Sequence, residues 1–162
     1  MDIRLASENA RIGFVFNKIG ITPEACSSWF LPRVVGISQA LEWCMRGHVF
    51  DAQEALDGGL VKAVYPEDEL LPKAYALAAE IAENAAPVSI ALTRQMMWRM
   101  LGADHPMAAH RVDSRGILAL GASADAREGV ESFLEKRAAV YPDRVSDGLP
   151  DIFPDWDEPA FS

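Results

Sequence analysis

The sequence predicts a mixed α/β fold that is mostly helical, with a small β portion near its start. Polar and apolar residues alternate over 2–6, and short apolar runs follow at 12–16 and 60–64, as is typical of strands. From Thr22 on, helix caps, helix stops and 3.6-residue periodicity dominate. The chain has 162 residues, of which half are hydrophobic, so it can bury a core without a disulfide or a structural metal.

The first two strands are expected at 2–6 and 12–16, with a turn at Ser7-Glu8-Asn9 between them. Two short strands do not form a stable sheet by themselves, so this opening resembles the edge of something larger. A first helix is expected from Pro23 to Leu31. Thr22 offers a hydroxyl cap, Pro23 suits a first helical turn, and Pro32 cannot continue a helix.

The rest of the chain is predicted to be nearly all helix, because apolar residues recur at helical spacing between recognisable caps and stops. Asp51 and Ser123 can cap helices, and Gly47 and Gly58-Gly59 can end them. The expected helices span 38–46, 52–56, 67–84, 87–101, 106–120 and 124–139, with a strand at 60–64. The acidic, proline-rich segment 142–162 is expected to be extended, and ordered only if Phe153, Trp156 or Phe161 docks onto something.

Composition excludes several classes of function. Fifteen Lys and Arg against 24 Asp and Glu give a net charge of −9, which disfavours nucleic acid but allows a small anionic ligand. We expect no membrane span, because no stretch approaches about 18 uncharged apolar residues, and no signal peptide at the start. Two cysteines are too few for a disulfide scaffold, so a reducing, cytoplasmic location is expected.

Most familiar catalytic patterns are weak or missing. His105 and His110 are five residues apart and do not share a helical face, so they do not predict a metal site. Ser27 and Ser28 lack the Gly-x-Ser-x-Gly elbow of a nucleophile. Cys26 has no nearby base and is interpreted as a small packed hydrophobe. The methionine and tryptophan cluster at 96–100 could line an acyl pocket, but core packing is favoured.

Glu24 is the strongest candidate for a catalytic carboxylate in this sequence. Its neighbours are small or apolar, among them Ile21, Ala25 and Trp29. If this stretch is buried, desolvation favours the protonated form of the carboxyl and makes it a useful general base. Alternatively, an acid in a first helical turn simply stabilises the helix. Both interpretations stay open on the residues alone.

Four segments, in this order and spacing, carry a family resemblance: 2–13, 20–36, 52–61 and 125–137. The first reads as strand–turn–strand and the second as an active-site helix. The third fits A-x-E-A-x-x-x-G-L-V, and the fourth fits E-G-x-x-x-F-x-E-K-R. Together they resemble the crotonase, or enoyl-CoA hydratase/isomerase, superfamily over about residues 1–141.

The resemblance implies the C-terminal half of the ClpP/crotonase spiral fold. Residues 1–66 would be the end of the spiral ββα core with the active-site helix, 67–141 a helical oligomerisation region, and 142–162 an acidic tail outside the resemblance. Met1 would fall in a strand near the middle of the usual chain. We therefore expect the chain to be a fragment, or its start to be late, and to lack the two backbone N–H groups of the family's oxyanion hole.

The resemblance also assigns roles to particular residues. Glu24 matches the carboxylate of the Δ3,Δ2-enoyl-CoA isomerases, where one base moves a proton from C2 to C4. The second glutamate of the hydratases aligns with Phe16, which cannot accept a proton. Trp29 is a candidate wall of the acyl pocket. Phe133 and Lys136 match positions that contact CoA, where a lysine meets phosphate as a point charge.

The implied activity is double-bond chemistry on an acyl-CoA substrate, isomerase-like through Glu24, with no metal or redox cofactor. The implied assembly is a homo-oligomer, either trimer or hexamer. One alternative is a catalytically inert oligomerisation or interaction module without an oxyanion hole. Another is a 2-enoyl-CoA hydratase. Other crotonase chemistries, such as thioester hydrolysis or dehalogenation, also stay open.

Overall fold

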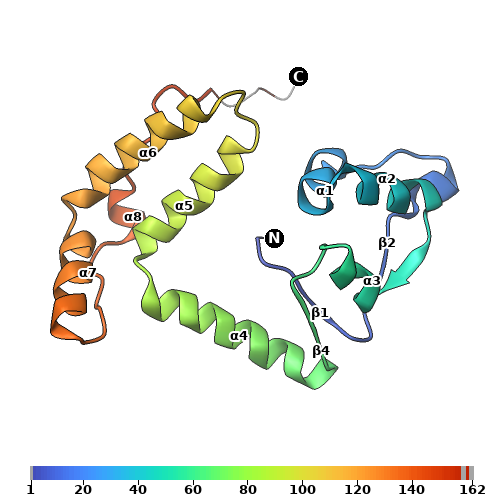
Figure 1. Ribbon diagram of the computed structural model, residues 1–162, viewed down its shortest axis with the longest axis horizontal. Coiled ribbons are helices and arrows are strands. Elements are labelled where there is room, and N and C mark those ends of the chain that lie inside the picture. The colour runs from blue at the N-terminus through green and yellow to red at the C-terminus, as the bar shows by residue number, and fades with distance from the viewer. Residues whose placement is uncertain (1, 158–159, 161–162) are drawn as a thin grey trace. The chain divides into compact units, whose positions relative to one another are not determined.

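The structure, a computed structural model, describes residues 2–157 and 160 (Figure 1). Residues up to Ala78 form one compact unit and residues from Ala79 on form another. The elements are β1 (Leu5–Ser7), β2 (Arg11–Gly13), the 3₁₀ helix η1 (Val15–Ile19), α1 (Ser27–Val35), α2 (Ile37–Arg46), β3 (Val49–Asp51), α3 (Ala52–Asp57), β4 (Ala63–Tyr65), α4 (Glu67–Asn84), α5 (Pro87–Met100), α6 (Pro106–Gly121), α7 (Ala124–Glu135) and α8 (Val145–Gly148). The mostly helical α/β prediction is confirmed. The three-part division at 66 and 141 stays a prediction.

The strands of the first unit pair in two short ladders. β1 lies parallel to β4 with Leu5 opposite Ala63, and β2 lies antiparallel to β3 with Ile12 opposite Phe50. The predicted turn after β1 is confirmed, since the Ala10 N–H donates to the Ser7 carbonyl. The second predicted strand is shorter than expected, because the chain enters η1 soon after Gly13.

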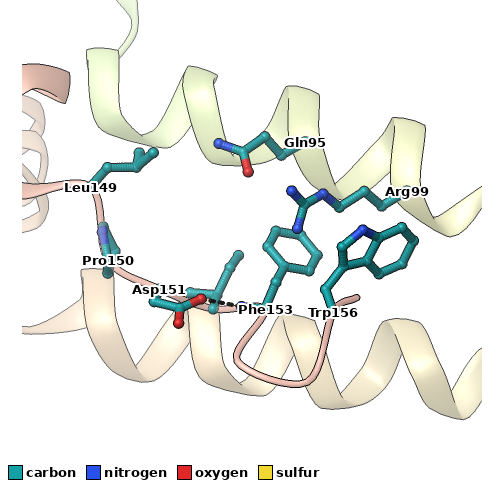
Figure 2. Close-up of a pocket in the computed structure, with 8 residues that line it drawn as sticks. Gln95, Arg99, Leu149, Pro150, Asp151, Phe153 and Trp156 are labelled. Carbon is teal, nitrogen blue, oxygen red and sulfur yellow. Dashed lines mark hydrogen bonds between the residues drawn. The ribbon is translucent and has the colours of Figure 1, made fainter. Parts of the chain in front are cut away.

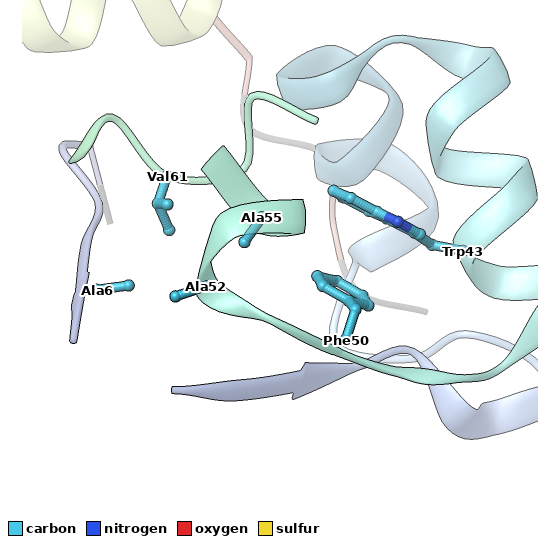
Figure 3. Close-up of a cluster of buried hydrophobic side chains, with 6 residues drawn as sticks. All are labelled: Ala6, Trp43, Phe50, Ala52, Ala55 and Val61. Carbon is cyan, nitrogen blue, oxygen red and sulfur yellow. The ribbon is translucent and has the colours of Figure 1, made fainter. Parts of the chain in front are cut away.

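The core of the first unit is built around a stack of aromatic rings (Figure 3). Trp43 is fully buried and stacks on Phe50 with 4.4 Å between ring centroids. The buried members of this core are Ala6, Trp43, Phe50, Ala52, Ala55 and Val61. Gly58 has a steric role here, because a Cβ at this position would lie 2.5 Å from the indole ring of Trp43.

The helix predicted to begin at Pro23 begins instead at Ser27. Ala25 and Cys26 take positive φ values of 53° and 57°, so a left-handed turn separates the Pro23-Glu24 pair from the helix. Pro32 lies inside α1, which continues to Val35 rather than ending at Leu31. The prediction that Cys26 packs as a hydrophobe is wrong, since the thiol is exposed.

Several other helix boundaries are confirmed by their caps. Gly47 ends α2 in the left-handed conformation. The Asp51 carboxylate accepts the Glu54 N–H at 2.9 Å and starts α3, while Ser123 accepts the Ala126 N–H at 3.1 Å and starts α7. α7 ends at Glu135 rather than 139, because Lys136 adopts a left-handed conformation.

The core of the second unit lies between α5 and α6, which contact one another. Its buried residues are Val88, Leu92, Val112 and Ile152, with Met96, Met100, Leu120 and Phe153 partly buried against them. The preference for core packing in the 96–100 cluster is confirmed for Met96 and Met100, whereas Met97 is exposed.

The tail is more structured than the sequence predicts. It contains the short helix α8, and Phe153 is the predicted anchor that docks on this core. Phe161 lies outside the described residues. Over residues 2–157 and 160, none of the helices combines the length and the apolarity that crossing a bilayer requires.

Candidate functional site

Glu24 lies in the loop between η1 and α1, not in a helical turn. Its carbonyl accepts two hydrogen bonds from Ser27, one from the backbone N–H at 3.0 Å and one from the hydroxyl at 2.6 Å. This turn, together with the left-handed Ala25 and Cys26, fixes where the carboxylate projects from the chain. The helix-stabilising interpretation of Glu24 is therefore wrong, because the residue precedes the helix.

Glu24 is exposed in this chain, so the burial considered from the sequence is not found here. Three apolar side chains of the same segment are exposed with it: Ile21, Trp29 and Phe30. Exposed apolar side chains around a carboxylate are what one wall of an acyl pocket would present. Burial of Glu24 thus requires something else to cover this segment.

Trp29 is held in place by Arg33. The guanidinium lies 4.0 Å from the centre of the Trp29 ring and donates to the Trp29 carbonyl at 2.9 Å. Trp29 is 36% exposed, so the cation covers only part of the ring. The predicted pocket residue is therefore fixed in orientation and still accessible.

Phe16 connects the site loop to the sheet. It belongs to η1 and is half-buried, and its carbonyl accepts the Ile21 N–H at 3.1 Å. Gly20 makes the intervening turn with φ 76°. Phe16, where the resemblance places the second carboxylate of the hydratases, is thus close to the Glu24 loop along the chain, and its side chain has no acid–base chemistry.

The other two predicted residues lie at the end of α7. Phe133 is 82% exposed and Lys136 is also exposed. Lys136 ends the helix in the left-handed conformation with φ 54°, and its N–H donates to the Phe133 carbonyl. Val130 and Leu134 add to the exposed apolar surface of α7. This end of α7 therefore carries an exposed lysine three residues after an exposed phenylalanine.

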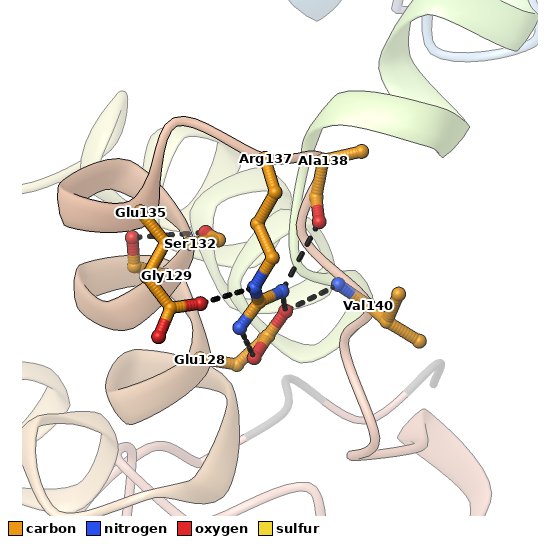
Figure 4. Close-up of polar contacts among 7 residues, drawn as sticks. All are labelled: Glu128, Gly129, Ser132, Glu135, Arg137, Ala138 and Val140. Atoms are coloured by element: carbon orange, nitrogen blue, oxygen red, sulfur yellow. Dashed lines mark hydrogen bonds and ion pairs between the residues drawn. The ribbon is translucent and has the colours of Figure 1, made fainter.

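An ion-pair network fixes the turn that follows Lys136 (Figure 4). Both oxygens of the Glu128 carboxylate accept from Arg137, and one of them also accepts the Val140 N–H at 2.7 Å. Arg137 donates to Glu135 as well, at 2.7 Å. These hydrogen bonds turn the chain back along α7 and leave Lys136 at the bend.

The network changes the acidity of its members. The hydrogen bonds from Arg137, followed by the one from the Val140 backbone, lower the pKa of Glu128 to about 2. The carboxylates of Glu128 and Glu135 raise the pKa of Arg137. Glu128 and Arg137 are the first and last residues of the segment E-G-x-x-x-F-x-E-K-R. Within that segment they shape the turn that presents Lys136.

A second polar cluster went unrecognised in the sequence. One oxygen of Glu54 accepts from the Trp43 indole at 2.8 Å and contacts His48 Nε2 at 2.9 Å. The Trp43 hydrogen bond is the main reason that the pKa of Glu54 is lowered. The only sequence signal was Glu54 within A-x-E-A-x-x-x-G-L-V. Its partners lie in α2 and the following loop, so only the fold brings them together.

The predicted site residues divide between the two units: Glu24 and Trp29 belong to the first, and Phe133 and Lys136 to the second. Each pair combines one exposed charged residue with one exposed aromatic residue, five positions apart in the first unit and three positions apart in the second. No pair carries a cluster of metal ligands: over the part of the chain that the structure describes, there is no group of three or more His, Cys, Asp or Glu side chains suited to a metal ion.

Comparison with known proteins identifies the fold and the family of the chain. The chain shares its fold with a crystal structure titled a probable enoyl-CoA hydratase/isomerase from Mycobacterium abscessus, with TM-score 0.84 and 32% identity over 88% of this chain and 58% of that one. The enoyl-CoA hydratase structure from Bacillus anthracis has TM-score 0.82 and 30% identity, over 86% of this chain and 54% of that one. The fold is therefore of the crotonase type, as predicted.

Residues 1–144 match the family model for enoyl-CoA hydratase/isomerase, and the chain belongs to this family. Among curated relatives, the enoyl-CoA hydratase ACTT3 of Alternaria alternata is 39% identical over 146 residues, which cover 90% of this chain and 49% of the relative. The chain spans about half the length of the curated relatives it matches.

Proposed function

We propose that this chain contributes to double-bond chemistry on an acyl-CoA thioester, with Glu24 as the group that carries the proton. Membership of the family supports the substrate class. The observation that carries the role of Glu24 is its position: a carboxylate on a loop fixed by Ser27, with Ile21 and Trp29 exposed along the same segment. A cover over this segment would enclose the carboxylate with an acyl chain.

The reaction that needs only this carboxylate is Δ3,Δ2-enoyl-CoA isomerisation. The base removes a proton from C2, the double bond moves from C3–C4 to C2–C3, and the same carboxyl returns the proton at C4. The thioester enolate formed on the way needs hydrogen-bond donors at its oxygen. On the resemblance, we expect those donors to come from the half of the relatives' length that the match does not cover.

Lys136 and Phe133 would hold the CoA moiety. The exposed ammonium can meet a phosphate, and the 82% exposed ring of Phe133 can cover an apolar or planar part of the ligand. We propose no redox cofactor, because a proton shift between two carbons needs no oxidant or reductant, and no metal, because the carboxyl itself is proposed to carry the proton. The apolar surface of α7 supports assembly as a homo-oligomer, for which a trimer or hexamer is our proposal.

Hydration of a 2-enoyl-CoA is the second candidate, because relatives of this chain are named enoyl-CoA hydratases. Its difficulty is Phe16, which stands where the resemblance places a second carboxylate. An inert interaction module is the third candidate. It is favoured by the exposure of Glu24, since an exposed carboxylate without a cover has no means of excluding water from its reaction.

The test compares this chain with a version extended upstream, each assayed with 3-enoyl-CoA and with 2-enoyl-CoA. We expect the extended protein to isomerise 3-enoyl-CoA, and Glu24→Gln to reduce kcat by about 10²- to 10⁴-fold. Glu8→Gln is the matched control, because Glu8 is an exposed acid of the same unit. Hydration that survives Glu24→Gln would support the hydratase, and no turnover by either protein would support the inert module.

A further inference from the structure

The last described segment of the chain lies beyond the matched family region and is nevertheless anchored. The family match ends at residue 144. We call residues 145–157 the strap. Just before it, residues 137–143 run back along α7. Tyr141 lies against Gly129, where an added Cβ would be 3.8 Å from the tyrosine ring. Asp143 and Asp125 exchange two hydrogen bonds, each backbone N–H donating to the other carboxylate, at 2.9 and 3.1 Å.

The strap then attaches to α5 and α6 (Figure 2). Ile152 is 1% exposed and belongs to the core formed by Val88, Leu92 and Val112. The guanidinium of Arg99, on α5, lies 4.3 Å from the centre of the Phe153 ring. A hollow of about 350 Å³, lined in part by Gln95 and Leu149, remains between α5 and the strap. The strap therefore covers only part of the surface of α5.

Two further contacts hold the end of the strap. The same Arg99 guanidinium lies 5.0 Å from the centre of the Trp156 ring, and Arg115, on α6, forms an ion pair with Asp155 at 2.8 Å. The backbone N–H of Trp156 donates to the Phe153 carbonyl at 3.0 Å, which folds the strap into a turn around Arg99. Contacts between a cation and aromatic rings stabilise most where the groups are partly shielded from water, as Arg99 and Phe153 are.

These contacts form a closed path through the second unit. α7 follows α6 and contacts it. Residues 137–143 are bound to α7 at two points, through Val140 to Glu128 and through Asp143 to Asp125. The strap continues from there onto α5 and α6. The position of α7 is therefore constrained by α6 at its start and by the strap through the segment that returns along it.

We propose that the strap is a positioning element: its docking on α5 and α6 fixes α7, and with it the surface that presents Phe133 and Lys136. The link to ligand binding rests on the proposed function. The structural part does not, because it concerns only how α7 is held. Release of the strap uncovers the apolar core side of α5 and α6, and α7 is then held through its connection to α6 and their direct contact.

Hydrogen exchange of the full chain, measured by mass spectrometry, tests the structural part. Ile152→Ala removes the buried anchor, and Arg99→Ala removes the cation between the two rings without opening the core. We expect amide exchange in the strap and in α7 to accelerate together, by roughly tenfold or more for Ile152→Ala and less for Arg99→Ala. Arg46→Ala is the matched control, since Arg46 forms an exposed ion pair with Glu42 in the first unit.

Faster exchange in the strap with unchanged exchange in α7 would overturn the proposal, and so would unchanged exchange in both for Ile152→Ala and Arg99→Ala. Titration with coenzyme A separates this inference from the proposed function. Weaker binding in Arg99→Ala, as in Lys136→Ala, supports the whole path from strap to ligand. If amide exchange in α7 accelerates while coenzyme A affinity is the same in all variants, the positioning role of the strap is supported and the assignment of Lys136 to coenzyme A fails.

Discussion

Gly58 offers a direct test of how tightly the aromatic core of the first unit is packed. A Cβ at this position would lie 2.5 Å from both Cζ2 and Cη2 of Trp43, whereas ordinary van der Waals contact begins near 3.4 Å. The φ of Gly58 is −79°, so alanine meets no backbone strain there. The substitution Gly58→Ala therefore tests steric fit alone.

The magnitude follows from what would have to move. The indole is fully buried, stacked on Phe50 and bound to Glu54, so the ring or the end of α3 must shift by about 1 Å. Overpacking of this kind costs about 1–3 kcal/mol. Alanine also lowers the conformational entropy of the unfolded chain, which offsets about 0.4–1 kcal/mol of this cost. We expect Gly58→Ala to lower the free energy of unfolding by about 1–2 kcal/mol.

Urea unfolding, followed by tryptophan fluorescence and circular dichroism, measures this difference. Gly121→Ala is the matched control, because nothing lies within 4 Å of a Cβ there, and we expect it to be neutral or slightly stabilising. In a Trp43→Phe background the clashing carbons are absent, so Gly58→Ala should become less costly. Equal stability of Gly58→Ala and the unchanged protein would refute the packing argument.

Two further predictions concern polar contacts. Because Arg137 lowers the pKa of Glu128 to about 2, the stabilisation from this carboxylate is complete above pH 4.5 and is lost as the pH falls toward 2. Glu128→Gln should remove that part of the acid dependence of urea stability, and superimposable profiles would contradict it. Asp51→Ala removes the cap of α3 and should cost about 0.5–2 kcal/mol of unfolding free energy, while Asp51→Asn should retain most of it. Equal losses in the two variants, again from urea unfolding, would exclude the cap as the cause.

The sequence predicted best where structure depends on local chemistry. Asp51 and Ser123 cap their helices, and Gly47 ends α2, because each acts on backbone groups only a few residues away. The start of α1 was mispredicted because Thr22 and Pro23 carry a helix-start signal that the left-handed Ala25 and Cys26 override. β3 was missed because three residues give little pattern, and its partner β2 is distant in sequence.

The candidate site shows the same limit. Residue chemistry made Glu24 a candidate and the family resemblance added Trp29, Phe133 and Lys136, but neither tells whether a side chain is covered. The exposure of Glu24 depends on what packs over the segment 21–30, and the Glu54 cluster depends on α2 meeting α3. The docking of Phe153 likewise depends on Arg99, which lies more than fifty residues earlier in the chain.

Under the proposed function, the left-handed backbone of Lys136 brings stability and ligand recognition into conflict at one position. A residue with a side chain at φ 54° is strained by about 1 kcal/mol, and glycine would relieve that strain. Selection for folding alone would thus favour glycine at the bend, and selection for an anion contact would favour lysine. If every substitution of Lys136 is scored once for the amount of folded protein and once for coenzyme A binding, glycine should rank high on the first scale and low on the second.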